Sequence, residues 1–177
     1  SPVKRVLWIG GGVGIAPLFP QMRMLKEKGA TVDVVLGGRS ADLVILKEEF
    51  EGLVDNMFYA TNDGSLGVTG FVTDVLKSRL EEGVQYDLVV AIGPMVMMKA
   101  VVDITKPLGI PTGISLNPIM IDGTGMCGGC RVNVGGEVKF ACVDGPDFDG
   151  LKVDFDETKR RQSFYKEEEH ACNLRED

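Results

Sequence analysis

Residues 3–17 read V-K-R-V-L-W-I-G-G-G-V-G-I-A-P, and this pattern indicates the fold class of the chain. Residues 3–10 are rich in β-branched and large apolar side chains, which favours a strand. Glycines follow at once, and Pro17 stands in the first turn of a helix predicted over about 17–28. A strand that passes through a glycine turn directly into a helix is typical of the first unit of an α/β fold.

The same alternation continues through the first two thirds of the chain. Ser40 or Asp42 is expected to cap a second helix that continues to about Phe50, and further helices are predicted over 71–82 and about 95–105. The other predicted strands cover residues 31–36, 57–61, 86–92 and 112–116. Together these elements predict a five-stranded parallel sheet with helices on both faces.

Composition and charge limit the class of protein. The chain has 177 residues, of which 44% are hydrophobic and 25% charged, so it can bury a core. Its net charge of −7 argues against a general nucleic-acid binder. No apolar run is long enough to cross a membrane, and residues 1–10 lack the layout of a signal peptide, so a cytoplasmic protein is expected.

The alternation stops at Asn117, and a cysteine-rich stretch follows. Residues 122–142 read D-G-T-G-M-C-G-G-C-R-V-N-V-G-G-E-V-K-F-A-C, which contains a predicted hairpin over 131–140. The spacing D-x4-C-x2-C-x11-C matches the plant-type spacing for a [2Fe–2S] cluster, with aspartate in the first position. A tetrahedral zinc site remains an alternative, and the aspartate could instead hydrogen-bond the loop. The candidate metal ligands are Asp122, Cys127, Cys130 and Cys142.

Two glycine loops close predicted strands on the carboxyl edge of the sheet, where α/β proteins bind ligands. The first, Gly10–Gly14, can offer helix N–H groups to a phosphate. It does not fit the dinucleotide fingerprint G-x-G-x-x-G, because Ile15 or Pro17 stands where the last glycine is needed. Arg39 follows the second strand, at the position where that fingerprint is accompanied by an acidic residue. A tight turn that binds no ligand therefore remains an alternative explanation of the first glycine loop.

The loops G-G-G-V-G-I-A-P (10–17) and I-G-P-M-V-M-M (92–98) resemble the nicotinamide domain of the ferredoxin–NADP reductase superfamily. The cysteine spacing narrows the resemblance to the electron transfer subunits of dihydroorotate dehydrogenase type B. Among these subunits, Asp122 in the first ligand position and the long C-terminal tail make the chain resemble the branch formed by the small subunits of NADH-dependent reduced ferredoxin:NADP oxidoreductase. Ile92 replaces the cysteine of the family's C-G-P motif.

The resemblance implies roles for the glycine loops and for the loop T-N-D-G-S-L-G (61–67). Arg39 would lie near the adenine ribose, either touching a 2′-phosphate or pairing with carboxylates; the resemblance favours NAD(H) over NADP(H). The methionines of 95–98 are also explained by helix packing. The implied pyrophosphate turn comprises Gly11, Gly12, Gly14, Ala16 and Pro17. The residues implied to border the nicotinamide are Gly93, Pro94 and Met98. The residues implied to lie near the nucleotide are Thr61, Asp63, Gly64 and Gly67.

The resemblance also implies a flavin-binding barrel before this chain, whose R-x-[YF]-[ST] signature does not occur here. We therefore expect a C-terminal part of a longer protein, with FAD on the missing domain. Residues 1–116 would form the nicotinamide-nucleotide-binding domain, and residues 117–150 would form the [2Fe–2S] cluster-binding lobe. The charged tail, 151–177, is expected to be either a helix that docks on a larger iron–sulfur flavoprotein or dehydrogenase subunit, or a mobile terminus. The alternative is a non-catalytic, zinc-containing, nucleotide-binding regulatory or structural domain.

Overall fold

The computed structural model describes residues 3–164 and 170–172. It divides the chain into two compact units, unit 1 over residues 1–115 and unit 2 over residues 116–177. None of the helices in the described ranges is long and apolar enough to cross a membrane.

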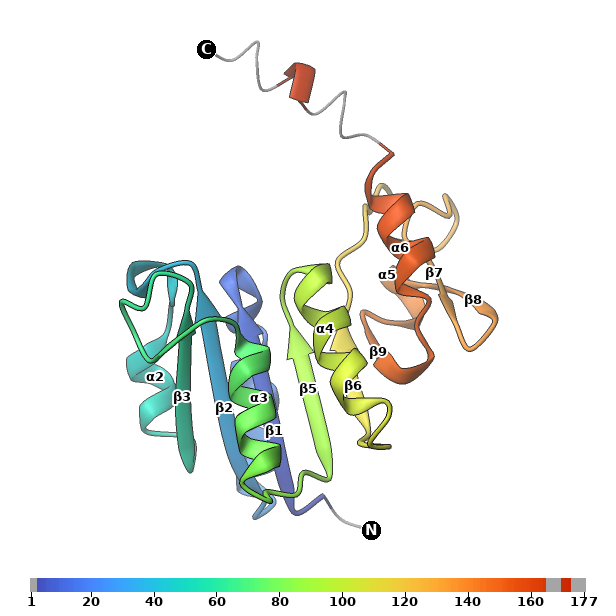
Figure 1. The fold of residues 1–177 in the computed structure, drawn as a ribbon. Coiled ribbons are helices and arrows are strands. Elements are labelled where there is room, and N and C mark those ends of the chain that lie inside the picture. Colours follow the sequence, from blue (N-terminus) through green and yellow to red (C-terminus); the bar gives the residue numbers. More distant parts are fainter. Residues whose placement is uncertain (1–2, 165–169, 173–177) are drawn as a thin grey trace. The chain divides into compact units, whose positions relative to one another are not determined.

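Unit 1 is an α/β layer structure built on a parallel sheet (Figure 1). β1 pairs in parallel with β2 on one side and with β5 on the other. The strands are β1 (Arg5–Gly11), β2 (Thr31–Gly38), β3 (Asn56–Thr61), β4 (Val68–Thr69), β5 (Leu88–Ile92) and β6 (Thr112–Ser115). The helices are α1 (Leu18–Glu27), α2 (Lys47–Glu51), α3 (Val72–Glu81) and α4 (Met95–Thr105), with 3-10 turns at Gly12–Ile15 and Ala41–Leu43.

Helices cover both faces of this sheet, as the sequence predicts. One core cluster joins Trp8 of β1 with Leu18 and Met22 of α1 and with Phe50 of α2. On the other face lie α3 and α4, which stand in front of the sheet in Figure 1 and pack on its strands. Because both faces are covered, β1 and β2 are buried along almost their whole length, which accounts for their continuous apolar sequences.

The prediction of five strands is wrong, because the sheet has seven, in the order β4-β3-β2-β1-β5-β6-β9. β4 has two exposed residues, and β9 (Asp147–Asp149) is a three-residue D-F-D segment. Both are short end strands of the sheet with little apolar surface to bury. Such strands leave no hydrophobic run in the sequence from which they could be predicted.

The helix predicted from Ser40 or Asp42 to Phe50 is also wrong in its extent. A 3-10 turn occupies Ala41–Leu43, and α2 begins only at Lys47. Between them Leu46 has a φ of 58°, the left-handed region that interrupts a right-handed helix. Val44 in the intervening segment is buried in the core, so packing outweighs helical continuity there.

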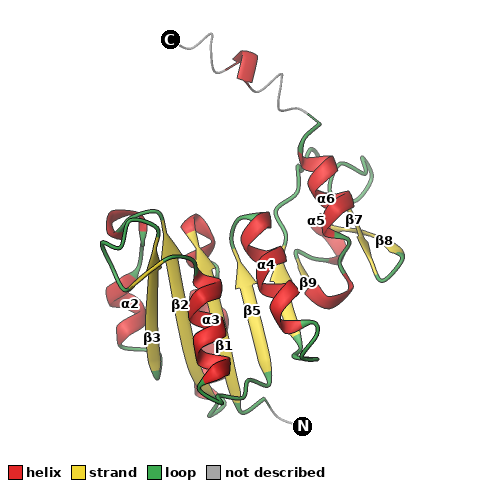
Figure 2. Ribbon diagram, viewed as in Figure 1, coloured by secondary structure: helices red, strands yellow, loops and turns green. Residues whose placement is uncertain are grey.

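Unit 2 contains the predicted hairpin, which is followed by short helical and extended elements (Figure 2). β7 (Arg131–Val134) and β8 (Glu137–Phe140) pair antiparallel, which confirms the hairpin. Gly135 and Gly136 join them with φ values of 64° and 84°, as a two-residue hairpin turn requires. After β8 come α5 (Ala141–Asp144), β9, a 3-10 turn (Gly150–Lys152) and α6 (Phe155–Gln162).

The first part of the tail is a docked helix within unit 2. Asp154 caps α6 by accepting the Glu157 N–H at 2.8 Å, and Phe155 and Thr158 are buried. Just before the helix, the Asp154 N–H donates to the Asn133 carbonyl at 2.9 Å. α6 is therefore tied to β7. The remaining tail residues 165–169 and 173–177, including the apolar Tyr165, lie outside the described residues.

A buried carboxylate joins the amino ends of three strands and the loop that precedes β5. Asp33 of β2 is fully buried and accepts hydrogen bonds from Arg5 at 2.8 and 3.1 Å, from Asn56 at 2.7 Å and from the Tyr86 hydroxyl at 2.9 Å. Burial, together with the hydrogen bond to Asp33, raises the pKa of Tyr86 to about 12. The cluster lies at the edge of the sheet opposite the glycine loops and has no evident signature in the sequence.

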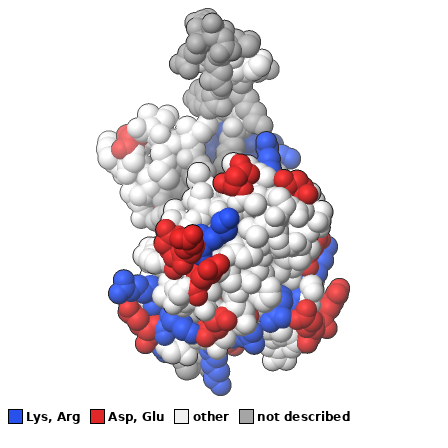
Figure 3. Space-filling view, turned by 90° about the vertical axis from the view of Figure 1, so that its left-hand side faces the viewer, with Lys and Arg blue, Asp and Glu red and all other residues white. Residues whose placement is uncertain are grey.

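Charged side chains of both signs are intermixed on the face drawn in Figure 3. Between them lies a broad uncharged area, and this face shows no continuous basic stripe of the kind that tracks a nucleic-acid backbone.

Candidate functional site

A pocket of about 790 Å³ lies at the carboxyl end of the sheet in unit 1. It is lined by the residues that follow β1, β2, β3 and β5, together with the start of α3 and one side of α4. The volume is in the range of pockets that hold small-molecule ligands. Of the residues predicted from the sequence, Gly11, Gly12, Arg39 and Pro94 line it.

The two glycine loops pack against each other beneath this pocket. A Cβ on Gly14 would lie 2.5 Å from the Ile92 carbonyl oxygen, and one on Gly93 would lie 3.2 Å from Gly11 Cα. Only glycine permits backbones to approach so closely. Gly12 has a φ of 56° and open space where a Cβ would stand, so its backbone is accessible to a ligand.

Ala16, Pro17 and Met98 do not line the pocket in the described structure. Ala16 and Pro17 are exposed and lead into α1, for which Pro17 is the N-cap residue. Met98 is fully buried among the apolar residues of α4, whereas its neighbour Met97 faces the pocket. Helix packing, the alternative considered from the sequence, therefore accounts for Met98.

The T-N-D-G-S-L-G residues mainly build their own loop. Buried Thr61 donates its hydroxyl to the Leu66 carbonyl at 2.8 Å and accepts the Leu66 N–H at 3.0 Å. Asp63 accepts the Ser65 hydroxyl at 2.6 Å, which lowers the pKa of this carboxyl. Gly64 and Gly67 have φ values of 73° and 66° and supply the turns. Within this loop Asn62 lines the pocket.

Several pocket residues were not singled out from the sequence. Phe71, at the start of α3, is 64% exposed although it is a large aromatic residue. Val13 and Val96 are also exposed at the pocket. An exposed apolar residue in a loop has no periodic signature, so only its position at the pocket reveals it. Asp42 belongs to the same lining as Arg39 and introduces an acidic group there.

In unit 2 the structure brings two of the four predicted metal ligands together. The thiol of Cys130 donates to Cys142 Sγ at 3.2 Å, and this contact raises the pKa of the Cys142 thiol. Cys127 is exposed, and its Sγ accepts the Gly129 N–H at 3.3 Å. Within residues 3–164 and 170–172, no group of three or more His, Cys, Asp or Glu side chains converges on one metal position.

Asp122 holds the loop that precedes Cys127. Its carboxylate accepts the Thr124 N–H at 2.8 Å and the Cys127 N–H at 3.0 Å. The Thr124 N–H, first among several hydrogen bonds, lowers the pKa of Asp122. The loop-forming role considered from the sequence is thus present. It does not exclude ligation, since a carboxylate can accept about four interactions.

The chemistry of this loop fits an iron–sulfur cluster. Three thiols of one segment are free of disulfides, and N–H groups donate to two of them: Gly129 to Cys127, and Cys142 to Cys130 at 3.4 Å. Hydrogen bonds from the backbone to sulfur are characteristic of such sites. The apolar residues Ile121, Met126 and Val143 are exposed around the loop. Cys172 is exposed and free, outside this loop.

Two family models match the chain, one in each unit. The oxidoreductase NAD-binding domain matches residues 8–103, more than half of the chain. The iron–sulfur cluster binding domain of dihydroorotate dehydrogenase B matches residues 117–154. The first covers the pocket and both glycine loops, and the second covers all four predicted metal ligands.

Two curated relatives match almost the whole chain, and one of them is named for electron transfer. An electron transfer subunit homolog of dihydroorotate dehydrogenase B from Thermotoga maritima is 48% identical over 93% of this chain and 57% of its own length. An uncharacterized protein in the adh 3′ region of Clostridium beijerinckii is 52% identical over 97% of this chain and 58% of its own. The chain thus spans a little over half the length of these curated relatives.

A solved structure shares the fold of nearly the entire chain. A chain from the structure of the NADH-dependent reduced ferredoxin-NADP oxidoreductase has a TM-score of 0.88 and 44% identity, over 99% of this chain and 63% of that chain. This chain therefore belongs to the oxidoreductase NAD-binding domain family, and it carries the iron–sulfur cluster binding domain of dihydroorotate dehydrogenase B electron transfer subunits.

Proposed function

We propose that this chain is the nicotinamide-nucleotide-binding and [2Fe–2S] part of a flavoprotein electron-transfer subunit. The supporting observation is the pocket formed where the two glycine loops meet, in one chain with a three-thiol loop in which two of the sulfurs accept N–H groups. The chain's relatives extend well beyond it, and we assign FAD to a domain outside these residues. The electron acceptor is a larger partner subunit.

Each unit has its own task in this proposal. In unit 1 the exposed backbone of Gly12 and the first turns after β1 bind the nucleotide phosphates, and Phe71 offers an aromatic face to a base. In unit 2 Asp122, Cys127, Cys130 and Cys142 hold the cluster, which when bound accepts and passes on one electron at a time. The close pair Cys130 and Cys142 suits one iron of a two-iron cluster.

Anaerobic purification followed by two measurements tests the proposal. The oxidised protein is expected to be brown, and its reduced form to give the electron paramagnetic resonance (EPR) signal of a [2Fe–2S] cluster. Titration with NADH is expected to show saturable binding. A colourless protein that holds zinc, or one that does not bind NADH or NADPH, would contradict it.

Arg39 is proposed to lie beside the adenine ribose and to influence the choice between NADH and NADPH. It is exposed at the pocket, with Asp42 in the same lining. We expect NADH to bind more tightly than NADPH, because Asp42 repels a 2′-phosphate. Arg39→Ala is then expected to weaken NADPH binding by about tenfold, the effect of losing about 1.4 kcal/mol, and NADH binding by less. Calorimetric titration with both nucleotides measures this; equal losses would contradict it.

Phe71 is proposed to stack on a base of the bound nucleotide. Aromatic stacking contributes about 0.5–1.5 kcal/mol beyond burial, so Phe71→Ala is expected to weaken NADH binding by roughly three- to tenfold. Phe71→Tyr keeps the ring and is expected to bind as the wild type does. Fluorescence titration with NADH gives both constants. Phe164 is a matched control, being 63% exposed in unit 2, and Phe164→Ala should leave NADH affinity unchanged.

A further inference from the structure

Arg161, in the last turn of α6, contacts the loop between two predicted cluster ligands. Its Nη2 donates to the Gly128 carbonyl at 3.2 Å and lies 3.5 Å from the Gly129 carbonyl. Gly128 and Gly129 are the two residues that separate Cys127 from Cys130. The matched iron–sulfur domain ends at residue 154, so Arg161 lies beyond it.

The packing of α6 directs this side chain toward the loop. α6 contacts β7, and Arg161 follows buried Thr158 by three positions, on the buried side of the helix. Its guanidinium carbon lies 5.7 Å from the centre of the Phe164 ring. Its Nε is buried and has no hydrogen-bond partner in the described part of the chain. The guanidinium is thus partly removed from water, so its charge is less screened than that of an exposed arginine.

One peptide group connects Arg161 to a ligand sulfur. The Gly128 carbonyl accepts from Arg161, and the N–H of the same peptide, that of Gly129, donates to Cys127 Sγ at 3.3 Å. This peptide is trans, so its carbonyl and its N–H point in opposite directions. A cation bound to the carbonyl polarises the peptide and makes its N–H a stronger donor.

A stronger N–H donor and a nearby cation act in the same direction on a cluster. Reduction adds one negative charge, which both features stabilise, and hydrogen bonds to sulfur are among the factors that set cluster potentials. An arginine carries a permanent positive charge. We propose that Arg161 is a positioning residue for the cluster, one that orders the Cys127–Cys130 loop and raises the reduction potential. This inference rests on the proposed [2Fe–2S] cluster.

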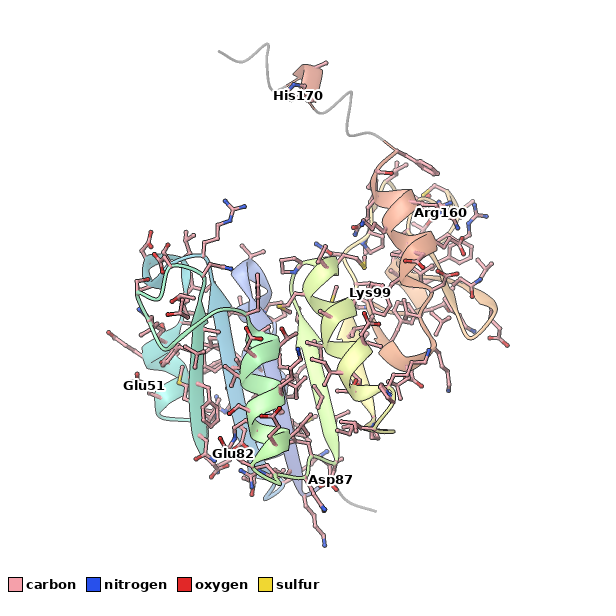
Figure 4. The ribbon with its side chains drawn as sticks, in the orientation of Figure 1. Glu51, Glu82, Asp87, Lys99, Arg160 and His170 are labelled. Atoms are coloured by element: carbon pink, nitrogen blue, oxygen red, sulfur yellow. The ribbon has the colours of Figure 1, made fainter. Side chains whose placement is uncertain are left out.

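Arg160 provides a matched control. It is the preceding residue on the same helix, is exposed, and is labelled on α6 in Figure 4. Its side chain has no hydrogen bond or ion pair to the loop among the described residues. Arg160→Gln and Arg161→Gln each remove one positive charge, at neighbouring positions. In both variants the glutamine amide still offers a side-chain N–H donor. A difference between them therefore reports the contact with the loop and not the net charge of the protein.

The experiment is a redox titration of the intact protein, purified anaerobically and followed by the EPR signal of the reduced cluster. Arg161→Gln is expected to lower the ratio of reduced to oxidised cluster at a given potential by about tenfold, which is about 59 mV for a one-electron couple. Arg160→Gln should titrate like the wild type. Arg161→Lys, which keeps the charge, should recover part of the shift.

The outcomes separate this inference from the proposed function. If the wild type gives no [2Fe–2S] signal, the proposed function fails. If the wild type gives the signal and Arg161→Gln titrates like Arg160→Gln, only the role of Arg161 is overturned. If Arg161→Gln holds no cluster, the Arg161→Lys potential decides: a value below that of the wild type supports the role, and an unchanged value contradicts it. Faster loss of the EPR signal to an iron chelator in Arg161→Gln than in Arg160→Gln would support the ordering of the loop.

Discussion

Replacement of Cys130 by alanine is expected to abolish cluster binding. Cys130 is 2% exposed, accepts the Cys142 N–H at 3.4 Å and lies 3.2 Å from Cys142 Sγ, so it is the most enclosed of the proposed ligands. Alanine cannot bind iron, so the cluster would lose one of its four proposed ligands. Iron content is expected to fall from about two atoms per chain to near zero, with loss of visible absorption and of the EPR signal.

Two controls make the result specific. Cys172→Ala removes an exposed thiol outside the loop and is expected to leave iron content unchanged. Binding of NADH is expected to survive in Cys130→Ala, because the residues that line the pocket all belong to unit 1. Full cluster content in Cys130→Ala would contradict the assignment of Cys130 as a cluster ligand.

Replacement of Asp33 by alanine is expected to cause the largest loss of stability in unit 1. The substitution leaves Arg5, Asn56 and Tyr86 without the buried acceptor that they share. Removal of one partner from a buried ion pair costs about 3–5 kcal/mol. Arg5 is 31% exposed and can recover some hydration, so we expect a value of about 3 kcal/mol, near the lower end of that range.

Urea unfolding followed by the fluorescence of Trp8 measures this loss, because Trp8 is the only tryptophan of the chain and is buried in β1. Arg23→Ala breaks an ion pair in which both side chains are 67% exposed, and it is expected to cost less than about 1 kcal/mol. Asp33 and the pocket lie at opposite ends of β2, so the folded fraction of Asp33→Ala should bind NADH normally. A loss below about 1 kcal/mol would contradict the structural role of Asp33.

Much of unit 1 could be predicted from the sequence because its signals are local. Strands buried on both faces must be apolar throughout, and β1 and β2 are. The loops at Gly10–Gly14 and Gly93 require glycine because their backbones touch, so glycine marks them. β4 and the left-handed turn at Leu46 cannot be predicted in this way, because neither forms a periodic apolar pattern.

Local sequence patterns predict the alternation of strands and helices, the glycine loops at one edge of the sheet and the spacing of the four candidate ligands. Each of these depends on residues that are close together in the chain. Only long-range packing places Phe71 at the pocket, surrounds Asp33 with partners from β1, β3 and the loop before β5, and brings Arg161 to the cysteine loop. Arg161 and Gly128 are 33 residues apart, and only the packing of α6 on β7 brings them together. Contacts of this kind depend on how distant apolar faces bury one another, which no local pattern records.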